Sequence, residues 1–155
     1  MEELKFLQIN SESKGIDFSG IINWAEAWDW GVGKLVAKRL SRGKFTDLET
    51  IFVATVDGQY AGLCKLQERD GYGTDIDPAL TPFIASVYVD PAFRGRRLVG
   101  KLLDATCDYA RSLGFESVYI ISSHKGLYEK YGFEKFTQTV VMSGRIETLY
   151  KRNLL

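Results

Sequence analysis

The chain has 155 residues, of which 45% are apolar and 26% are charged, a composition that suits one globular domain with a substantial hydrophobic core. Basic and acidic side chains balance at 20 each, whereas a nucleic-acid-binding protein usually carries a basic excess. The sequence has no long apolar run and no signal-peptide layout. We therefore expect a single cytoplasmic domain over residues 1–155, with neither nucleic acid nor membrane as a partner.

The first forty residues predict one strand and two helices. Apolar side chains, among them Trp24 and Trp28, recur with helical spacing on both sides of a break at Gly31 and Gly33. The expected elements are a strand at residues 4–9, a helix at 20–30 and a helix at 32–40.

A β-hairpin is expected next, because Asp57 and Gly58 form a strong two-residue turn signal between two apolar, β-branched runs. Its strands should occupy residues 50–56 and 60–66. Residues 67–80 are polar and rich in turn-forming residues, so they predict a long irregular connection.

The most informative stretch is residues 82–100. Residues 83–89 are apolar and lie between two prolines, which predicts a buried strand, and a short basic loop then opens into an amphipathic helix at 98–113. Four cations crowd the start of this helix: Arg94, Arg96, Arg97 and Lys101. Cations are unfavourable at a helix N-terminus, but a strand, a glycine-containing loop and a helix start together favour phosphate binding. Solvated arginines on an exposed first turn are the alternative.

The C-terminal part predicts a strand at 116–121, a short helix at 126–131, and strands at 133–142 and 146–151. The element order is thus β-α-α-β-β-β-α-β-α-β-β. The strand–helix–strand unit over 83–121 requires parallel neighbours, and the hairpins give antiparallel ones. We expect an α/β fold with a mixed, mostly antiparallel sheet of six to seven strands and helices on both faces.

Metal chemistry is not expected. Cys64 and Cys107 lie far apart in apolar segments, which favours free buried thiols. His124 is the only histidine, and no cysteine pair has the spacing of zinc ligands.

Two segments resemble one family. Residues 87–103, Val-Tyr-Val-Asp-Pro-Ala-Phe-Arg-Gly-Arg-Arg-Leu-Val-Gly-Lys-Leu-Leu, resemble the acetyl-CoA-binding segment of the GNAT (Gcn5-related) N-acetyltransferases. Residues 126–134, Gly-Leu-Tyr-Glu-Lys-Tyr-Gly-Phe-Glu, resemble that family's late helix–turn–strand signature. The family's loop runs Arg or Gln, two residues, Gly, one residue, Gly or Ala. Arg94 fits the first position, whereas Arg97 and Val99 replace the two small residues that let the backbone approach a diphosphate.

The resemblance implies transfer of an acetyl group from acetyl-CoA to a primary amine of a small molecule or peptide, by direct attack in a ternary complex. The backbone of Val87 and Val89 would pair with the pantetheine arm, and the loop N–H groups would bind the diphosphate. The expected cofactor-binding residues are Val87, Tyr88, Val89, Arg94, Gly95, Arg96, Arg97, Leu98, Val99, Gly100, Lys101, Ser122 and Ser123.

Tyr128 matches the family's general acid, which would protonate the departing thiolate; core packing is the alternative. Glu68 is the first candidate for the general base, because it follows the strand at 60–66, with Asp75 and Asp77 as rivals. His124 could line the sulfur end of the cofactor, although a surface or capping role is the simpler interpretation.

The acceptor side is expected to involve Trp28, Trp30 and Asp75, with Glu26 and Asp29 nearby, although such tryptophans are more often core. The acidic residues between 68 and 77 favour a cationic acceptor. The final strands could pair across a homodimer.

Two other function classes remain open. Residues 95–101 fit a P-loop by spacing, but Leu102 stands where Mg²⁺ coordination requires Ser or Thr. A catalytically silent acyl-CoA-binding or interaction module would keep the basic loop without needing Tyr128.

Overall fold

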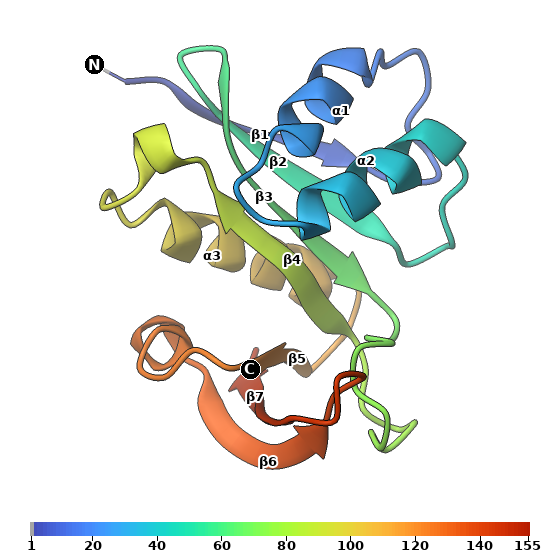
Figure 1. Cartoon of the computed structure of the whole chain (residues 1–155), viewed down its shortest axis with the longest axis vertical. Coiled ribbons are helices and arrows are strands. Elements are labelled where there is room, and N and C mark those ends of the chain that lie inside the picture. Colours follow the sequence, from blue (N-terminus) through green and yellow to red (C-terminus); the bar gives the residue numbers. More distant parts are fainter. Residues whose placement is uncertain (1) are drawn as a thin grey trace.

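The computed structural model describes residues 2–155. The strands are β1 (Leu4–Ile9), β2 (Thr50–Val56), β3 (Gln59–Gln67), β4 (Phe83–Val89), β5 (Ser117–Ser122), β6 (Glu134–Val140) and β7 (Ile146–Asn153). The helices are α1 (Ser19–Glu26), α2 (Val32–Arg42) and α3 (Leu98–Ser112), and two short 3-10 helices are η1 (Pro91–Phe93) and η2 (Tyr128–Tyr131). The strands form one seven-stranded sheet in the order β1-β2-β3-β4-β5-β7-β6 (Figure 1).

Every neighbouring pair of strands is antiparallel except β4 and β5, which α3 connects as a parallel pair. This is the mixed sheet with helices on both faces that the sequence predicts, so the predicted fold is confirmed. Among residues 2–155, no helix combines the length and apolar character that crossing a membrane would require.

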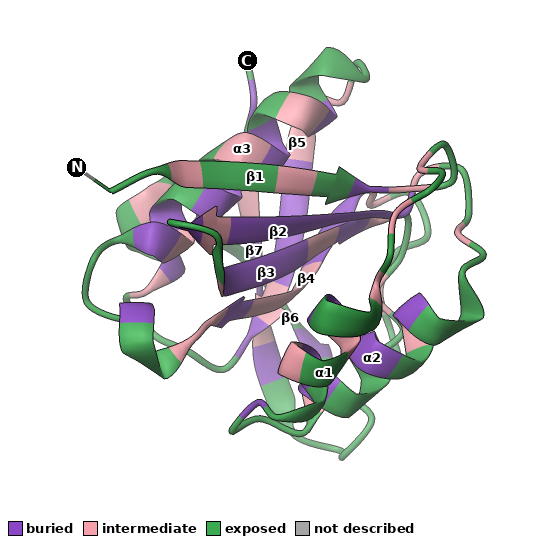
Figure 2. Ribbon diagram, turned by 90° about the horizontal axis from the view of Figure 1, so that it is seen from above, coloured by how far each residue is buried: buried purple, intermediate pink, exposed green. Residues whose placement is uncertain are grey.

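The two faces of the sheet carry separate helices because side chains alternate along each strand. Ile51 and Val53 of β2 face α1 and α2, whereas Phe52 and Ala54 of the same strand face α3. Figure 2 shows β2 and β3 as buried strands between these two layers. The central strands are therefore covered on both sides and supply a rigid base for the loops at their ends.

The first helix ends at Glu26, four residues before the end that the sequence predicts. The cause is close packing of α2 across the end of α1. A Cβ at Gly33 would lie 2.0 Å from the Ala25 carbonyl oxygen and 2.9 Å from the Trp28 Cβ. Residues 27–31 therefore form a connecting turn that brings Asp29 and Trp30 toward β4 rather than continuing the helix.

β4 contains a bulge that separates it from β5. Leu63 of β3 pairs with Tyr88 and Lys65 pairs with Ala85, so two residues of β4 oppose one residue of β3. Ser86 at the bulge has φ of 56°, in the left-handed region that non-glycine residues rarely adopt. β4 pairs with β5 only at Phe83 and Tyr119, and beyond that point the two strands diverge (Figure 1).

Candidate active site

A cavity of about 620 Å³ lies where β4 and β5 diverge. Its wall combines the end of β4, the start of α3, η2 and the turn between α1 and α2. The lining residues include Asp29, Trp30, Val87, Tyr88, Val89, Arg94, Arg97, Leu98, Val99, His124, Leu127, Tyr128 and Lys130. The cavity is thus bordered by an open strand edge, a helix N-terminus and a cluster of titratable side chains.

The start of α3 has no cap of its own. Arg97 is the N-cap residue, with φ of 60° in the left-handed region, and its side chain makes no capping hydrogen bond. The first turn also contains no acidic residue. Leu98 and Val99 of this turn border the cavity, so the unpaired N–H groups of the helix start lie at its wall.

The four cationic side chains of the loop border two different hollows. Arg97 lines the cavity, and Arg94 lines it while bonded to other residues. Arg96 instead forms an ion pair with Glu2 at 2.6 Å and lies over the Phe93 ring. Arg96 and Lys101 both border a second, smaller hollow of about 90 Å³. Only half of the predicted basic cluster therefore faces the main cavity.

Arg94 is held by three groups. Its Nε donates to the Val89 carbonyl at 2.9 Å, and its Nη1 and Nη2 donate to the two carboxylate oxygens of Asp29 at 3.3 and 3.1 Å. The Tyr88 hydroxyl donates to Asp29 at 2.7 Å. These hydrogen bonds from Tyr88 and Arg94 lower the pKa of Asp29, so its carboxylate stays ionised. Burial and the bond to Asp29 raise the pKa of Tyr88 to about 12.

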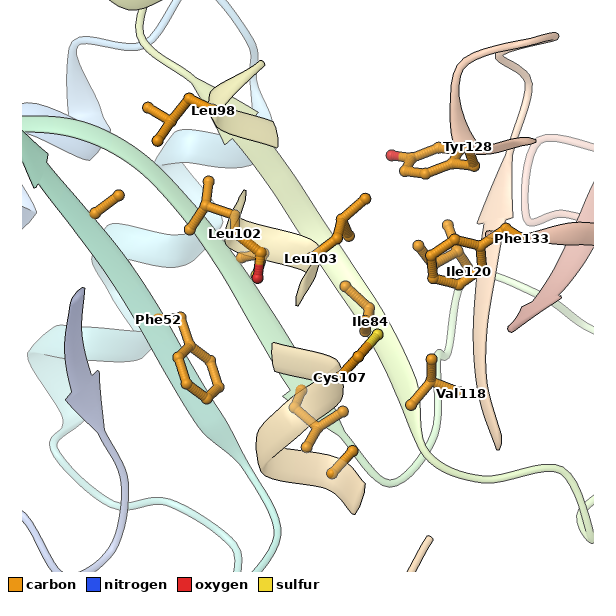
Figure 3. Packing of buried hydrophobic residues seen from close by; sticks show 14 of the residues in the cluster. Phe52, Ile84, Leu98, Leu102, Leu103, Cys107, Val118, Ile120, Tyr128 and Phe133 are labelled. Atoms are coloured by element: carbon orange, nitrogen blue, oxygen red, sulfur yellow. The ribbon is translucent and has the colours of Figure 1, made fainter. Parts of the chain in front are cut away.

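Tyr128 is 6% exposed and lines the cavity from η2. Its ring packs edge-on against Phe133, with ring centroids 5.9 Å apart, and also against Tyr150. Figure 3 shows its hydroxyl pointing from η2 toward the side where β4 and α3 lie. Burial raises the pKa of Tyr128 above its ordinary value, so the phenol keeps its proton at neutral pH.

His124 also lines the cavity, and its backbone is fixed from both sides. Its N–H donates to the Ser122 hydroxyl at 3.0 Å, and its carbonyl accepts from the Tyr150 hydroxyl at 2.7 Å. Ser122 is buried in this supporting role and Ser123 is exposed, and neither borders the cavity, although both were predicted to contact the cofactor.

Glu68 and Asp75 lie away from the cavity. Glu68 follows β3 at the end where Gln67 pairs with Phe83, whereas the cavity borders the other end of β4. Asp75 accepts hydrogen bonds from the Thr139 hydroxyl and the Val140 N–H, and it borders a different hollow beside β6. The predicted base and the predicted acceptor carboxylate are thus not brought together with Tyr128.

The predicted tryptophans separate into a core residue and a surface residue. Trp28 is buried and stacks on Tyr88 with ring centroids 3.9 Å apart, so it supports the site from behind. Trp30 is 43% exposed and lines the cavity.

Gly100 and Lys130 also depart from expectation. Gly100 does not border the cavity but contacts the Tyr131 ring. Lys130 does border it, and sequence reasoning missed this residue, because a one-turn 3-10 helix offers no periodicity from which to assign a face.

Comparison with known proteins agrees with this geometry. The model of the acetyltransferase (GNAT) domain matches residues 47–135, more than half of the chain. The chain belongs to the GNAT acetyltransferase family. As a GNAT protein it is an acyl-transferring enzyme, and the matched segment contains the loop at Arg94, the start of α3 and Tyr128.

Solved structures share the GNAT fold at low sequence identity. A GNAT-family protein from Desulfovibrio desulfuricans has a TM-score of 0.70 and 14% identity, covering 99% of this chain and 100% of that one. A GNAT acetyltransferase from Streptococcus pneumoniae has a TM-score of 0.66 and 12% identity, covering 97% and 99%. A chimera of the Vibrio cholerae spermidine N-acetyltransferase has a TM-score of 0.66 and 15% identity, covering 97% and 95%. Comparison with curated protein sequences gives no match.

Proposed function

We propose that this enzyme transfers the acetyl group of acetyl-CoA to a primary amine, by direct attack of the amine while both substrates are bound. One observation carries the proposal: the cavity between β4 and β5 joins an uncapped helix start to a buried, protonated tyrosine. The first feature suits the diphosphate of the coenzyme, and the second suits the thiolate that leaves.

The residues of the cavity fit coenzyme A in charge and polarity. Arg97 and Lys130 are cations that form no ion pair within residues 2–155, and they border the cavity beside the open N–H groups of the first turn of α3. Val87, Leu98 and Leu127 supply apolar surface for a pantetheine arm. The edge of β4 that faces away from β3 has no strand partner beyond Phe83, so it can pair with an extended arm.

Arg94 limits that pairing. Its Nε already occupies the Val89 carbonyl at 2.9 Å. The carbonyl becomes available to the pantetheine arm only if the guanidinium moves. Because the ion pair between Arg94 and Asp29 is about half exposed on both sides, with 49% and 54% of the side chains accessible, water can solvate both charges when the guanidinium moves.

Tyr128 is proposed as the general acid. Acetyl-CoA supplies an activated thioester, whose cleavage leaves a thiolate that needs a proton. Burial raises the pKa of Tyr128, so the phenol is protonated at neutral pH and can donate a hydrogen bond, and then its proton, to the departing thiolate. Tyr88 also borders the cavity and is buried, but its hydroxyl is hydrogen-bonded to the Asp29 carboxylate. Among the described residues, Tyr128 is therefore the one deeply buried tyrosine of the cavity without such a bond.

His124 replaces Glu68 as the proposed general base. Among the described residues that line the cavity, Asp29 is the only carboxylate, and it is bonded to Arg94 and Tyr88. The His124 imidazole can accept the amine proton directly or through water without breaking an ion pair. Glu68 keeps a role only if the acceptor reaches the far end of β4.

The P-loop alternative is weakened by the position of Leu102. A Walker-type loop needs a hydroxyl there for Mg²⁺, but Leu102 lies on the face of α3 that packs into the core and is fully buried (Figure 3). The silent acyl-CoA-binding module is tested by turnover.

The test is release of free thiol from acetyl-CoA in the presence of a panel of primary amines, together with calorimetry of acetyl-CoA binding. We expect saturable binding and amine-dependent thiol release. Binding without turnover on any amine would instead support the silent module. No binding at all would contradict the proposal.

A further inference from the structure

The protein's own Arg94 shows that the cavity contains a cation-binding arrangement. The guanidinium is bonded to the Asp29 carboxylate and the Val89 carbonyl, and its Cζ lies 5.5 Å from the centroid of the Tyr88 ring. A carboxylate, a carbonyl and an aromatic face are the groups that bind an organic cation.

A second aromatic face lies beside the first. Trp30 stacks nearly parallel to Tyr88, with ring centroids 6.4 Å apart and planes 17° apart, and it is exposed on the cavity side. Trp28 stacks on Tyr88 in the core and fixes its plane. Asp29 and Trp30 both come from the turn between α1 and α2, and they border the cavity together with the start of α3.

The Arg94 guanidinium cannot keep its contacts to the Asp29 carboxylate and also bind a diphosphate. It belongs to the loop that, under the proposed function, binds the coenzyme diphosphate. A diphosphate brings more negative charge than one carboxylate, and because the pair with Asp29 is half exposed, water can replace the contacts that the guanidinium gives up. Once the guanidinium turns to the diphosphate, Asp29 is left ionised without its cation, bonded to the Tyr88 hydroxyl and in the same cavity as Trp30.

We propose that Asp29, Trp30 and Tyr88 bind a second, non-reacting cationic group of the acceptor, and that Arg94 occupies this site until coenzyme A draws it away. The inference rests on the proposed function and specifies its acceptor: a primary amine that carries a further ammonium or guanidinium group. Asp29 is a specificity residue that takes no part in proton transfer. Coenzyme binding and acceptor binding are then coupled through one guanidinium.

The coupling is tested by calorimetry of 1,4-diaminobutane with and without saturating coenzyme A. In the wild-type protein we expect the diamine to bind at least about fivefold more tightly when coenzyme A is present. In Arg94→Ala the diamine should bind equally well in both conditions, because the competing cation is gone. In Asp29→Asn it should bind weakly in both. Equal diamine affinity with and without coenzyme A in the wild type would overturn the proposal, as would unchanged coupling in Asp29→Asn.

Specificity is tested by kinetics with 1,4-diaminobutane and 4-amino-1-butanol, which differ only in the distal group. The wild type should show a KM about tenfold lower for the diamine, and Asp29→Asn should remove this difference. Asp108→Asn is the matched control, because Asp108 is also an exposed carboxylate paired with an arginine, Arg111 on α3, and does not border the cavity. The control should keep the preference for the diamine.

The outcomes separate the two proposals. Turnover of both amines with equal KM would overturn the inference and leave the acetyltransferase proposal standing. Failure of acetyl-CoA to bind would overturn both. Loss of the diamine preference in Asp108→Asn as well as in Asp29→Asn would show a general charge effect and would also overturn the inference.

Discussion

The Tyr131 ring lies so close to Gly100 that a Cβ at Gly100 would be 2.5 Å from the Tyr131 Cε1. Gly100 is in the first turn of α3, and Tyr131 ends η2, the short helix that carries Tyr128. The position of the proposed general acid relative to the start of α3 therefore depends on this glycine–tyrosine contact. The small residue at this position leaves room for the Tyr131 ring, and it does not border the cavity.

Gly100→Ala should disturb the cavity more than the stability of the fold. Alanine favours a helix over glycine by about 0.5–1 kcal/mol, whereas overpacking costs about 1–3 kcal/mol. We expect the free energy of unfolding to fall by about 2 kcal/mol or less, and acetyl-CoA affinity to fall about tenfold as Tyr131 and η2 move. Denaturant unfolding and calorimetry measure the two effects. If displacement of the ring is the cause, Gly100→Ala should cost little stability in a Tyr131→Ala background.

Arg97→Gly should stabilise the protein. Arg97 has φ of 60°, a conformation that costs a non-glycine residue roughly 1–2 kcal/mol and glycine very little. We expect an increase of about 1 kcal/mol in the free energy of unfolding, measured by denaturant titration. Arg97→Ala removes the same charge but keeps the strain, so it should show no such gain. Equal stability of the two variants would mean that relief of the left-handed backbone is not the source of the stabilisation.

Tyr128→Phe should lower kcat by about 10²-fold or more and leave acetyl-CoA affinity nearly unchanged, since only the proton donor is lost. An acid that must be protonated loses activity as the pH rises through its pKa. Because burial raises the pKa of Tyr128, kcat of the wild type should fall only above pH 10. The plot of kcat against pH for the variant should lack this fall. An unchanged kcat would assign Tyr128 to packing alone.

The order of the elements could be predicted because each is specified locally. The Asp57–Gly58 turn, the break at Gly31 and Gly33, and the apolar stripe of α3 all act within a few residues. The side-chain directions in the basic loop could not be predicted. The left-handed residues Gly95 and Arg97 turn the chain there, so adjacent arginines face different hollows.

Contacts between distant segments could not be predicted from the sequence either. Arg94 and Asp29 are 65 residues apart, and their meeting depends on α1 ending early under α2. The position of Glu68 could have been inferred, because the end of one antiparallel strand lies beside the start of the next. Glu68 follows β3 and therefore lies beside the start of β4, away from the diverging end.

His124→Gln and Glu68→Gln should separate the two candidate bases. We expect His124→Gln to lower kcat/KM about 10²-fold near neutral pH, with partial recovery at high pH, where the free amine is abundant. Glu68→Gln should change kcat/KM less than twofold, because Glu68 does not border the cavity. The reverse order of effects would show that the acceptor binds beyond the bulge at Ser86.

Calorimetry of acetyl-CoA with the wild type and Val99→Asp tests most directly whether the cavity at the start of α3 binds the coenzyme. Val99 borders the cavity in the first turn of α3, so a carboxylate there opposes a diphosphate. Leu35→Asp, on the exposed face of α2, is the control. We predict micromolar binding by the wild type and the control, and a loss of affinity of at least about tenfold in Val99→Asp. Equal binding by all three proteins, or none by the wild type, would contradict it.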